Sequence, residues 1–159
     1  MARKSEANNS PRITNRRVRY EYAITEKLEV GIALLGSEVK SVRNGQVSLA
    51  EGFARVEPDD MQLFLHDVDI ALYAQAGPAQ HDPKRIRVLL AHKREIQKLL
   101  DETSTRGVTL VPLAMYFVRG KVKLEIGVGR GKAAHDKRQA IKTREADREI
   151  RKAMTRKRL

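Results

Sequence analysis

The chain has 159 residues, and its 32 Lys and Arg against 20 Asp and Glu give a formal net charge of +12. It contains no cysteine, which excludes disulfides, thiolate catalysis and cysteine-bound zinc. With 41% hydrophobic and 33% charged residues, the composition predicts one folded domain with additional arms, because such a chain cannot bury every segment.

The positive charge is concentrated at the two ends of the sequence. Residues 1–19 carry a net charge of +5, residues 20–129 carry −1, and residues 130–159 carry +8. Basic segments on a nearly neutral body are typical of proteins that bind a polyanion. Charge that serves solubility alone is the alternative, but its segregation into two segments favours nucleic acid.

The N-terminal residues 1–15 are polar and show no hydrophobic period, so we expect a disordered basic arm. They also lack the apolar stretch of a secretory signal. The longest apolar run, residues 108–118, is too short to span a bilayer. We therefore expect a cytoplasmic protein that makes no use of a membrane.

Two strands and a helix are predicted over the next segment. The loosely alternating YEYAIT (20–25) and the apolar LEVGIALLG (28–36) are typical of strands. A short helix is expected over 37–45, with Ser37 as its N-cap and Gly45 just beyond its end.

A hairpin is predicted in the middle of the chain. Residues 46–57 are expected to be extended, and Pro58, Asp59 and Asp60 form a turn signal. Together with the apolar stretch that follows, this places a hairpin over 52–68, and AQAGPAQHDP (74–83) is expected to be a loop.

The second half of the body is predicted to contain a helix and another hairpin. Apolar residues recur at helical spacing from Ile86 to Leu100, and Gly107 can end that segment. Residues 108–118 and 121–129 are expected to pair across a turn at Arg119 and Gly120, and Pro112 favours a bulge or a sheet edge there.

The predicted elements define a mainly β fold with helices. About six short antiparallel strands in so small a domain favour an oligonucleotide-binding-type (OB-like) β-barrel over residues 16–130, because a helix interrupts the strands midway. Residues 131–159 form a flexible basic tail of good helix formers with a narrow apolar stripe. We expect this tail to be disordered when free and helical when phosphates neutralise it.

The sequence offers little support for catalysis. The four histidines show no zinc-binding spacing, and the acidic pairs at 59–60 and 67/69 are better explained by a turn and a strand end than by a magnesium nuclease. Aromatic residues make up only 4% of the chain, which disfavours generic single-strand binding by stacking. Recognition of folded RNA through shape and backbone is the better interpretation.

Several sequence strings occur together in one order. They are NRRVRYEY (15–22), LEVGIALLGSEVKSVRNG (28–45), DPKRIRVLLAHKREI (82–96), GVTLVPLAMYF (107–117), KVKLEIGVGRGK (121–132) and HDKR (135–138). This series resembles the small protein B (SmpB) family, the SsrA-binding proteins of bacterial trans-translation. The resemblance implies an OB-like barrel that binds the tRNA-like domain of transfer-messenger RNA (tmRNA, SsrA). With elongation factor Tu, the family delivers this RNA to stalled ribosomes for ribosome rescue.

The resemblance implies no enzymatic activity, no cofactor and no metal, because the ribosome forms the peptide bond and alanyl-tRNA synthetase loads the alanine. Indirect partners through tmRNA are therefore this synthetase and elongation factor Tu, and the protein itself is expected to be a monomer. A permanently ribosome-bound structural protein and a small nuclease are the alternatives from other classes.

Two sets of site residues follow from the resemblance. The expected tmRNA-binding residues are Arg17, Arg19, Tyr20, Glu29, Lys40, Arg43, Leu90, His92, Arg130 and Lys132. On pattern alone, Leu90 would belong to the core, His92 would start a helix, and Glu29 would be a cross-strand partner for a lysine.

The second set lies in the tail. The residues expected at the ribosomal decoding centre are Gly131, Lys132, His135, Asp136, Lys137 and Arg138, and the tail beyond them is expected to occupy the empty mRNA channel. Ala133 departs from the usual second lysine of the family motif, which removes one possible phosphate contact. A solvated linker is the alternative for this string.

Overall fold

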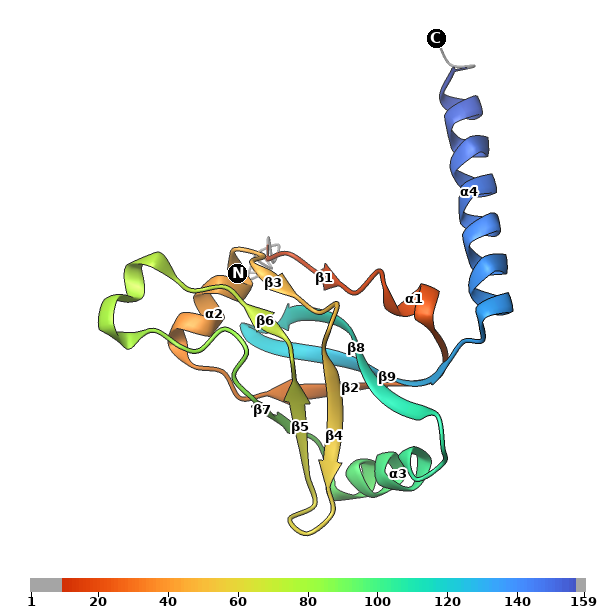
Figure 1. The fold of residues 1–159 in the computed structure, drawn as a ribbon. Helices are drawn as coiled ribbons and strands as arrows, with labels where there is room; N and C mark the ends of the chain where they lie inside the picture. The colour runs from red at the N-terminus through yellow and green to blue at the C-terminus, as the bar shows by residue number, and fades with distance from the viewer. Residues whose placement is uncertain (1–9, 157–159) are drawn as a thin grey trace, which may run out of the picture.

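The computed structural model describes residues 10–156 (Figure 1). Its strands are β1 (Ile13–Thr14), β2 (Tyr22–Ile32), β3 (Val47–Ser48), β4 (Phe53–Glu57), β5 (Gln62–His66), β6 (Asp69–Ile70), β7 (Arg87–Leu90), β8 (Val108–Val118) and β9 (Lys121–Gly131). Its helices are α1 (Val18–Glu21), α2 (Gly36–Arg43), the 3₁₀ segment η1 (Ala74–Ala79), α3 (Lys93–Thr103) and α4 (Ala134–Arg156).

Six of these strands close into a ring. β8 pairs with β4, and the pairing continues through β5, β7, β2 and β9 back to β8. All of these pairings are antiparallel. The predicted mainly β fold of about six antiparallel strands is therefore confirmed, and the ring is compatible with an OB-like barrel.

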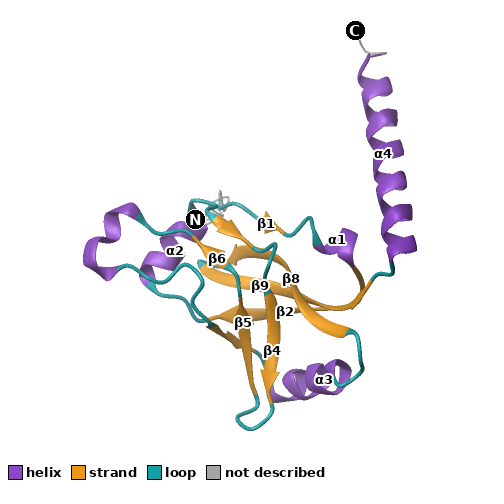
Figure 2. Ribbon diagram, in the orientation of Figure 1, coloured by secondary structure: helices purple, strands orange, loops and turns teal. Residues whose placement is uncertain are grey.

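The core lies inside this ring, because strand residues alternate between the barrel interior and its outer surface. On β9, Val122, Leu124, Ile126 and Val128 are all buried, as the strict alternation in the sequence predicts. Helix α3 covers one end of the barrel and buries Ile96 and Leu99 in the same core (Figure 2).

The β8–β9 hairpin is confirmed with its two-residue turn. Arg119 and Gly120 both have positive φ angles, of 50° and 78°, as a type I′ hairpin turn requires. The β8–β9 register shifts between Pro112 and Ala114, so the bulge predicted from Pro112 is present.

The helix predicted from residue 86 is wrong in its first part. Residues Arg87–Leu90 form strand β7, and helix α3 begins only at Lys93. Arg87 and Leu89 are buried and Val88 and Leu90 are not, which is a strand period. A buried arginine conceals this alternation, because a charged residue is normally read as facing solvent.

Arg87 is buried because it belongs to an ion cluster that no local sequence pattern indicates. Its Nε donates to Glu38 Oε1 at 2.8 Å, and Arg85 Nη2 lies 2.7 Å from Glu38 Oε2. Arg87 also donates to the carbonyls of Val68 and Pro83. These contacts join α2 to β7 and satisfy the buried carboxylate of Glu38.

Near the N-terminus, the structure differs from the expectation in three places. In place of the two strands expected at 20–25 and 28–36 there is one strand, β2, over Tyr22–Ile32 with an irregularity between Ile24 and Glu26, and residues 20–21 belong to α1 instead. The N-cap of α2 is Leu35 rather than Ser37, whose hydroxyl contacts His81 instead. In the expected arm, Ile13 and Thr14 form β1 and Asn15 is hydrogen-bonded to the barrel, and residues 1–9 lie outside the described part.

The basic tail is seen as helix α4, which projects away from the barrel (Figure 1). Its start is attached to α1, since the Lys132 amide donates to the Glu21 carbonyl at 2.9 Å and Lys132 Nζ to the Arg19 carbonyl at 3.0 Å. That the tail is disordered in the free protein stays a prediction.

Candidate nucleic-acid interface

Half of the expected RNA-binding residues gather where α1 meets the end of β9. Arg17, Arg19 and Tyr20 belong to α1 and its first flanking residue, and Arg130 and Lys132 follow on β9 and its exit. Tyr22 pairs with Gly131, so the two segments lie side by side. We call Arg17, Arg19, Tyr20, Arg130 and Lys132 the tail-end cluster.

Two cations of the tail-end cluster have structural partners. The Nε of Arg17 donates to Glu21 at 2.7 Å, and its guanidinium also pairs with Glu51. The hydrogen bond to Glu21 raises the pKa of Arg17, and the charges of both carboxylates add to the shift. Lys132 holds α1 through the Arg19 carbonyl. Arg19 and Arg130 are exposed cations of this cluster.

A second group lies on the outer face of the barrel. The strand registers align Tyr116 with Lys123, Lys123 with Gly31, and Gly31 with Leu90, which makes one row across β8, β9, β2 and β7. Glu29 lies two residues from Gly31 on the same face and is exposed. We call Glu29, Gly31, Leu90, Tyr116 and Lys123 the barrel-face cluster.

Leu90 lies in this cluster and not in the core, so the pattern-based expectation for it was wrong. Its side chain is 58% exposed. It lines an open groove of about 390 Å³ together with Gly31, Val39, Lys121 and Lys123, among others. The groove therefore has apolar walls and two lysines.

Two further expected cations lie on α2. Lys40 and Arg43 are both exposed, and Lys40 follows Val39, which lines the groove. The Arg43 guanidinium lies 5.5 Å from the ring centroid of Phe117, next to Tyr116 in β8. Phe117 packs against the core whereas Tyr116 faces outward, so this contact fixes Arg43 beside the end of β8 without placing it among the barrel-face side chains.

His92 is the N-cap of α3, in line with its expected place at a helix start. Its backbone amide donates to Glu95 Oε2 at 2.9 Å, and its side chain is exposed. Because it follows Leu90 by two residues, it lies at the border of the barrel-face cluster.

The two clusters lie toward opposite ends of β2. Tyr22 borders the tail-end cluster, and Glu29 is seven residues further along the strand. At about 3.3 Å per strand residue, the separation is roughly 20 Å. The structure thus places five of the ten expected RNA-binding residues in the tail-end cluster and Glu29 and Leu90 in the barrel-face cluster, instead of in one compact patch.

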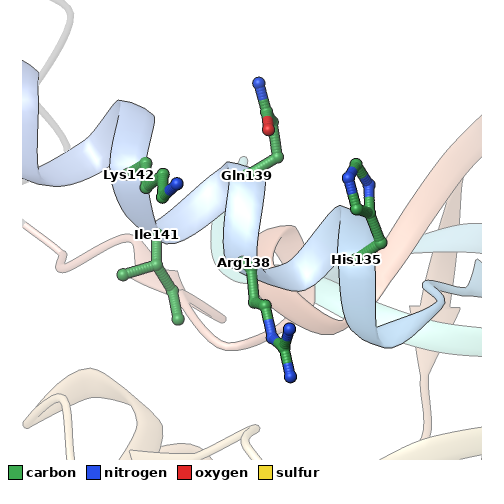
Figure 3. A pocket seen from close by; sticks show the side chains of 5 residues that line it. All are labelled: His135, Arg138, Gln139, Ile141 and Lys142. Atoms are coloured by element: carbon green, nitrogen blue, oxygen red, sulfur yellow. The ribbon is translucent and has the colours of Figure 1, made fainter.

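The expected decoding-centre residues lie at the joint and in the first turns of α4. Gly131, His135, Asp136 and Arg138 are exposed, and Lys132 and Lys137 are half-buried. Figure 3 shows His135 and Gln139 on one side of the helix and Arg138 and Ile141 on the other. The Ala133 carbonyl accepts from the Lys137 amide at 3.1 Å, so Ala133 contributes backbone to the helix start.

Tyr116, Arg12, Lys121 and Lys123 were not among the expected site residues. The alternation on β9 was a sufficient signal for the two lysines, since it places them opposite the buried positions. Tyr116 gave no such signal because β8 is apolar along most of its length and shows no alternation. Arg12 gave none because its position depends on pairing between β1 and β8, about a hundred residues apart in the sequence.

Within residues 10–156, no group of three or more His, Asp or Glu side chains is placed to hold a metal ion. Over the same described range, no helix has the length and apolarity needed to cross a bilayer.

The ring of six antiparallel strands, its exposed cations and the basic helix define a small barrel protein with a cationic helical extension. The family model described as SmpB protein matches residues 12–156. The chain therefore belongs to the SmpB family.

Similar proteins agree with this assignment. The SsrA-binding protein of Mycobacterium sp. (strain KMS) is 48% identical over 145 residues, covering 91% of this chain and 85% of the relative. That of Mycolicibacterium vanbaalenii is 45% identical, covering 99% and 96%. A solved structure described as "tmRNA-SmpB: a journey to the center of the bacterial ribosome" matches with a TM-score of 0.68 and 45% identity. That match covers 83% of this chain and 95% of the other.

Proposed function

We propose that this protein is an RNA-binding adaptor of trans-translation. It binds the tRNA-like domain of tmRNA and delivers it to stalled ribosomes, so that the nascent chain is tagged and the ribosome released. The observation that carries the proposal is the barrel-face cluster, where Lys123 and the exposed Leu90 line a groove and the Glu29 carboxylate lies on the same face. Such a surface suits folded RNA, which is recognised through backbone, ribose hydroxyls and accessible base edges.

The two RNA-facing clusters have separate roles in this proposal. Glu29, Leu90 and His92, with Lys40 and Arg43, contact the tRNA-like domain from the barrel. Arg17, Arg19, Tyr20, Arg130 and Lys132 extend this contact toward the tail. The separation of roughly 20 Å between the clusters supports binding to an extended surface of a structured RNA.

The tail has the ribosomal role. Gly131, Lys132, His135, Asp136, Lys137 and Arg138 contact the decoding centre, where His135 stacks on a base and the cations neutralise phosphates. The rest of the tail becomes helical in the empty mRNA channel. The exposure of the α4 side chains supports this role, because they are free to meet RNA.

The protein acts in the cytoplasm as a monomer, without a cofactor and without catalysing a reaction. Elongation factor Tu and alanyl-tRNA synthetase are partners of the RNA and meet this protein only through it.

Affinity for the tRNA-like domain, compared with unrelated duplex RNA over a salt series, tests the barrel. We expect strong preference for the tRNA-like domain at ~150 mM salt, where nonspecific binding is weak. Equal affinity for the two RNAs would refute the proposal.

A chain ending at Ala134 tests the division between barrel and tail. We expect it to retain binding to the tRNA-like domain and to lose tagging on stalled ribosomes. Loss of both activities in a chain that still folds would refute the division into two surfaces.

A further inference from the structure

The N-terminal segment brings a cation to the barrel-face cluster. Ile13 and Thr14 pair with Met115 and Ala114 of β8, and the buried side chain of Asn15 donates to the Leu49 and Pro112 carbonyls at 2.9 and 3.0 Å. This anchoring places Arg12 over β8. Its guanidinium carbon lies 4.4 Å from the Tyr116 ring centroid, within the range of a cation–π contact.

Two glutamates lie directly opposite each other beneath this arginine. Glu29 of β2 is in register with Glu125 of β9, an arrangement that is unfavourable for like charges. Glu125 is neutralised by cations, with Arg12 at 3.6 Å and Lys27 at 3.9 Å. Glu29 has a different partner, because its Oε2 accepts a hydrogen bond from the Tyr116 hydroxyl.

The difference between these partners determines whether the Glu29 carboxylate keeps its negative charge. A cation would cancel the charge of the Glu29 carboxylate, whereas a neutral hydroxyl restricts its position and leaves the charge in place. Within the described residues, Glu29 Oε1 has no hydrogen-bond or ion-pair partner. That oxygen remains available to accept from a donor of the RNA.

We propose that Tyr116 and Arg12 are positioning residues that hold Glu29 in place for RNA binding. Tyr116 fixes the carboxylate through its hydroxyl, and Arg12 covers the Tyr116 ring and neutralises the opposing Glu125. This inference rests on the proposed function, because it deepens the role of Glu29 in binding the tRNA-like domain. The ligand group is a hydrogen-bond donor of that RNA.

The contact can be tested in the free protein, independently of RNA. Burial, followed by the hydrogen bond to Glu29, raises the pKa of Tyr116 to about 12. Phenolate absorbance should therefore show a late-ionising tyrosine that Tyr116→Phe removes, and Glu29→Gln should lower its pKa. An unchanged Tyr116 titration in Glu29→Gln would refute the contact.

A double-mutant cycle tests the role in binding. Tyr116→Phe should weaken binding to the tRNA-like domain by about three- to tenfold, the effect of one lost hydrogen bond. In the Glu29→Gln background the same substitution should have little further effect, because both changes disrupt one interaction. Equal losses in the two backgrounds would make Tyr116 structural and overturn the proposal.

The salt dependence distinguishes positioning from phosphate contact for Arg12. Arg12→Gln should weaken binding without changing the slope of log K against log salt. A slope reduced by about one unit would identify Arg12 as a phosphate contact and overturn its positioning role. Arg55→Gln, at an exposed position of β4, is the matched control and should change neither affinity nor slope.

The outcomes separate this inference from the proposed function. A Glu29-dependent titration without preference for the tRNA-like domain would refute the function, and with it the role of the contact in RNA binding. Preferential binding that is insensitive to Tyr116→Phe would refute only the inference.

Discussion

Glu38 is a fully buried carboxylate that joins α2 to β7 through Arg85 and Arg87. Replacing it with glutamine leaves the buried Arg87 charge without its counter-ion. We expect Glu38→Gln to lower the free energy of unfolding by about 3–5 kcal/mol, measured by urea denaturation. Asp60→Asn, in the exposed β4–β5 turn, is the control and should change it by less than about 0.5 kcal/mol.

The same carboxylate predicts a dependence of stability on pH. Burial on its own raises the pKa of Glu38, but hydrogen bonds from Arg85, the Leu35 amide and Arg87 outweigh burial, and the pKa falls below its ordinary 4.5. The folded chain thus binds this proton more weakly than the unfolded chain. The stabilisation is complete above about pH 4.5 and is lost as the pH falls through the lower, folded-state pKa.

Urea denaturation at a series of acidic pH values measures this effect. The free energy of unfolding should fall more steeply below pH 4.5 in the original chain than in Glu38→Gln. Parallel curves for the two proteins would show that Glu38 does not carry the acid sensitivity.

Among the elements, β7 shows why a strand can be missed when it is predicted from the alternation of polar and apolar residues. The ring strands with regular alternation, above all β9, could be predicted because each exposed position is polar and each inward position apolar. In β7 the inward position is Arg87 and the exposed position is Leu90, which inverts that rule. The partner that makes Arg87 acceptable in the core, Glu38, is 49 residues away and gives no local signal.

Adjacent residues of β7 give a matched pair for testing this arrangement. Leu89 is 2% exposed and Leu90 is 58% exposed. Leu89→Ala should cost about 2–4 kcal/mol of stability, whereas Leu90→Ala should cost less than about 1 kcal/mol. Thermal or urea denaturation measures both, and similar losses would contradict the observed register.

For RNA binding, substitution of the exposed leucine should have the larger effect. Leu90→Ala should weaken binding to the tRNA-like domain several-fold. Leu89→Ala should change the affinity little, provided that it is measured under conditions in which this variant is folded. An unchanged affinity in Leu90→Ala would remove this leucine from the proposed interface.

For the whole molecule, charge segregation and the ordered motif series were enough to predict a barrel with a basic extension. The pairing of β1 with β8 was not predictable, because Ile13–Thr14 is too short to show a period. The division of the expected RNA-binding residues into two clusters was also missed, since it depends on the length of β2 between them.

The tail should contribute most to nonspecific binding. Residues 135–159 contain ten Lys and Arg and four Asp and Glu. A chain ending at Ala134 should therefore show, on unrelated duplex RNA, a slope of log K against log salt that is shallower by about 2–4 units. Filter binding or fluorescence anisotropy measures the slopes, and identical values would show that the tail is not the nonspecific contact.

Closure of the strand ring has a consequence for how the barrel meets its ligand. No strand of the ring can slide without displacing both neighbours, so the alignment of Tyr116, Lys123, Gly31 and Leu90 is fixed before binding. A preorganised template of this kind loses little conformational freedom on association. The entropic penalty of forming the complex then falls mainly on the RNA and on the exposed helix, not on the barrel.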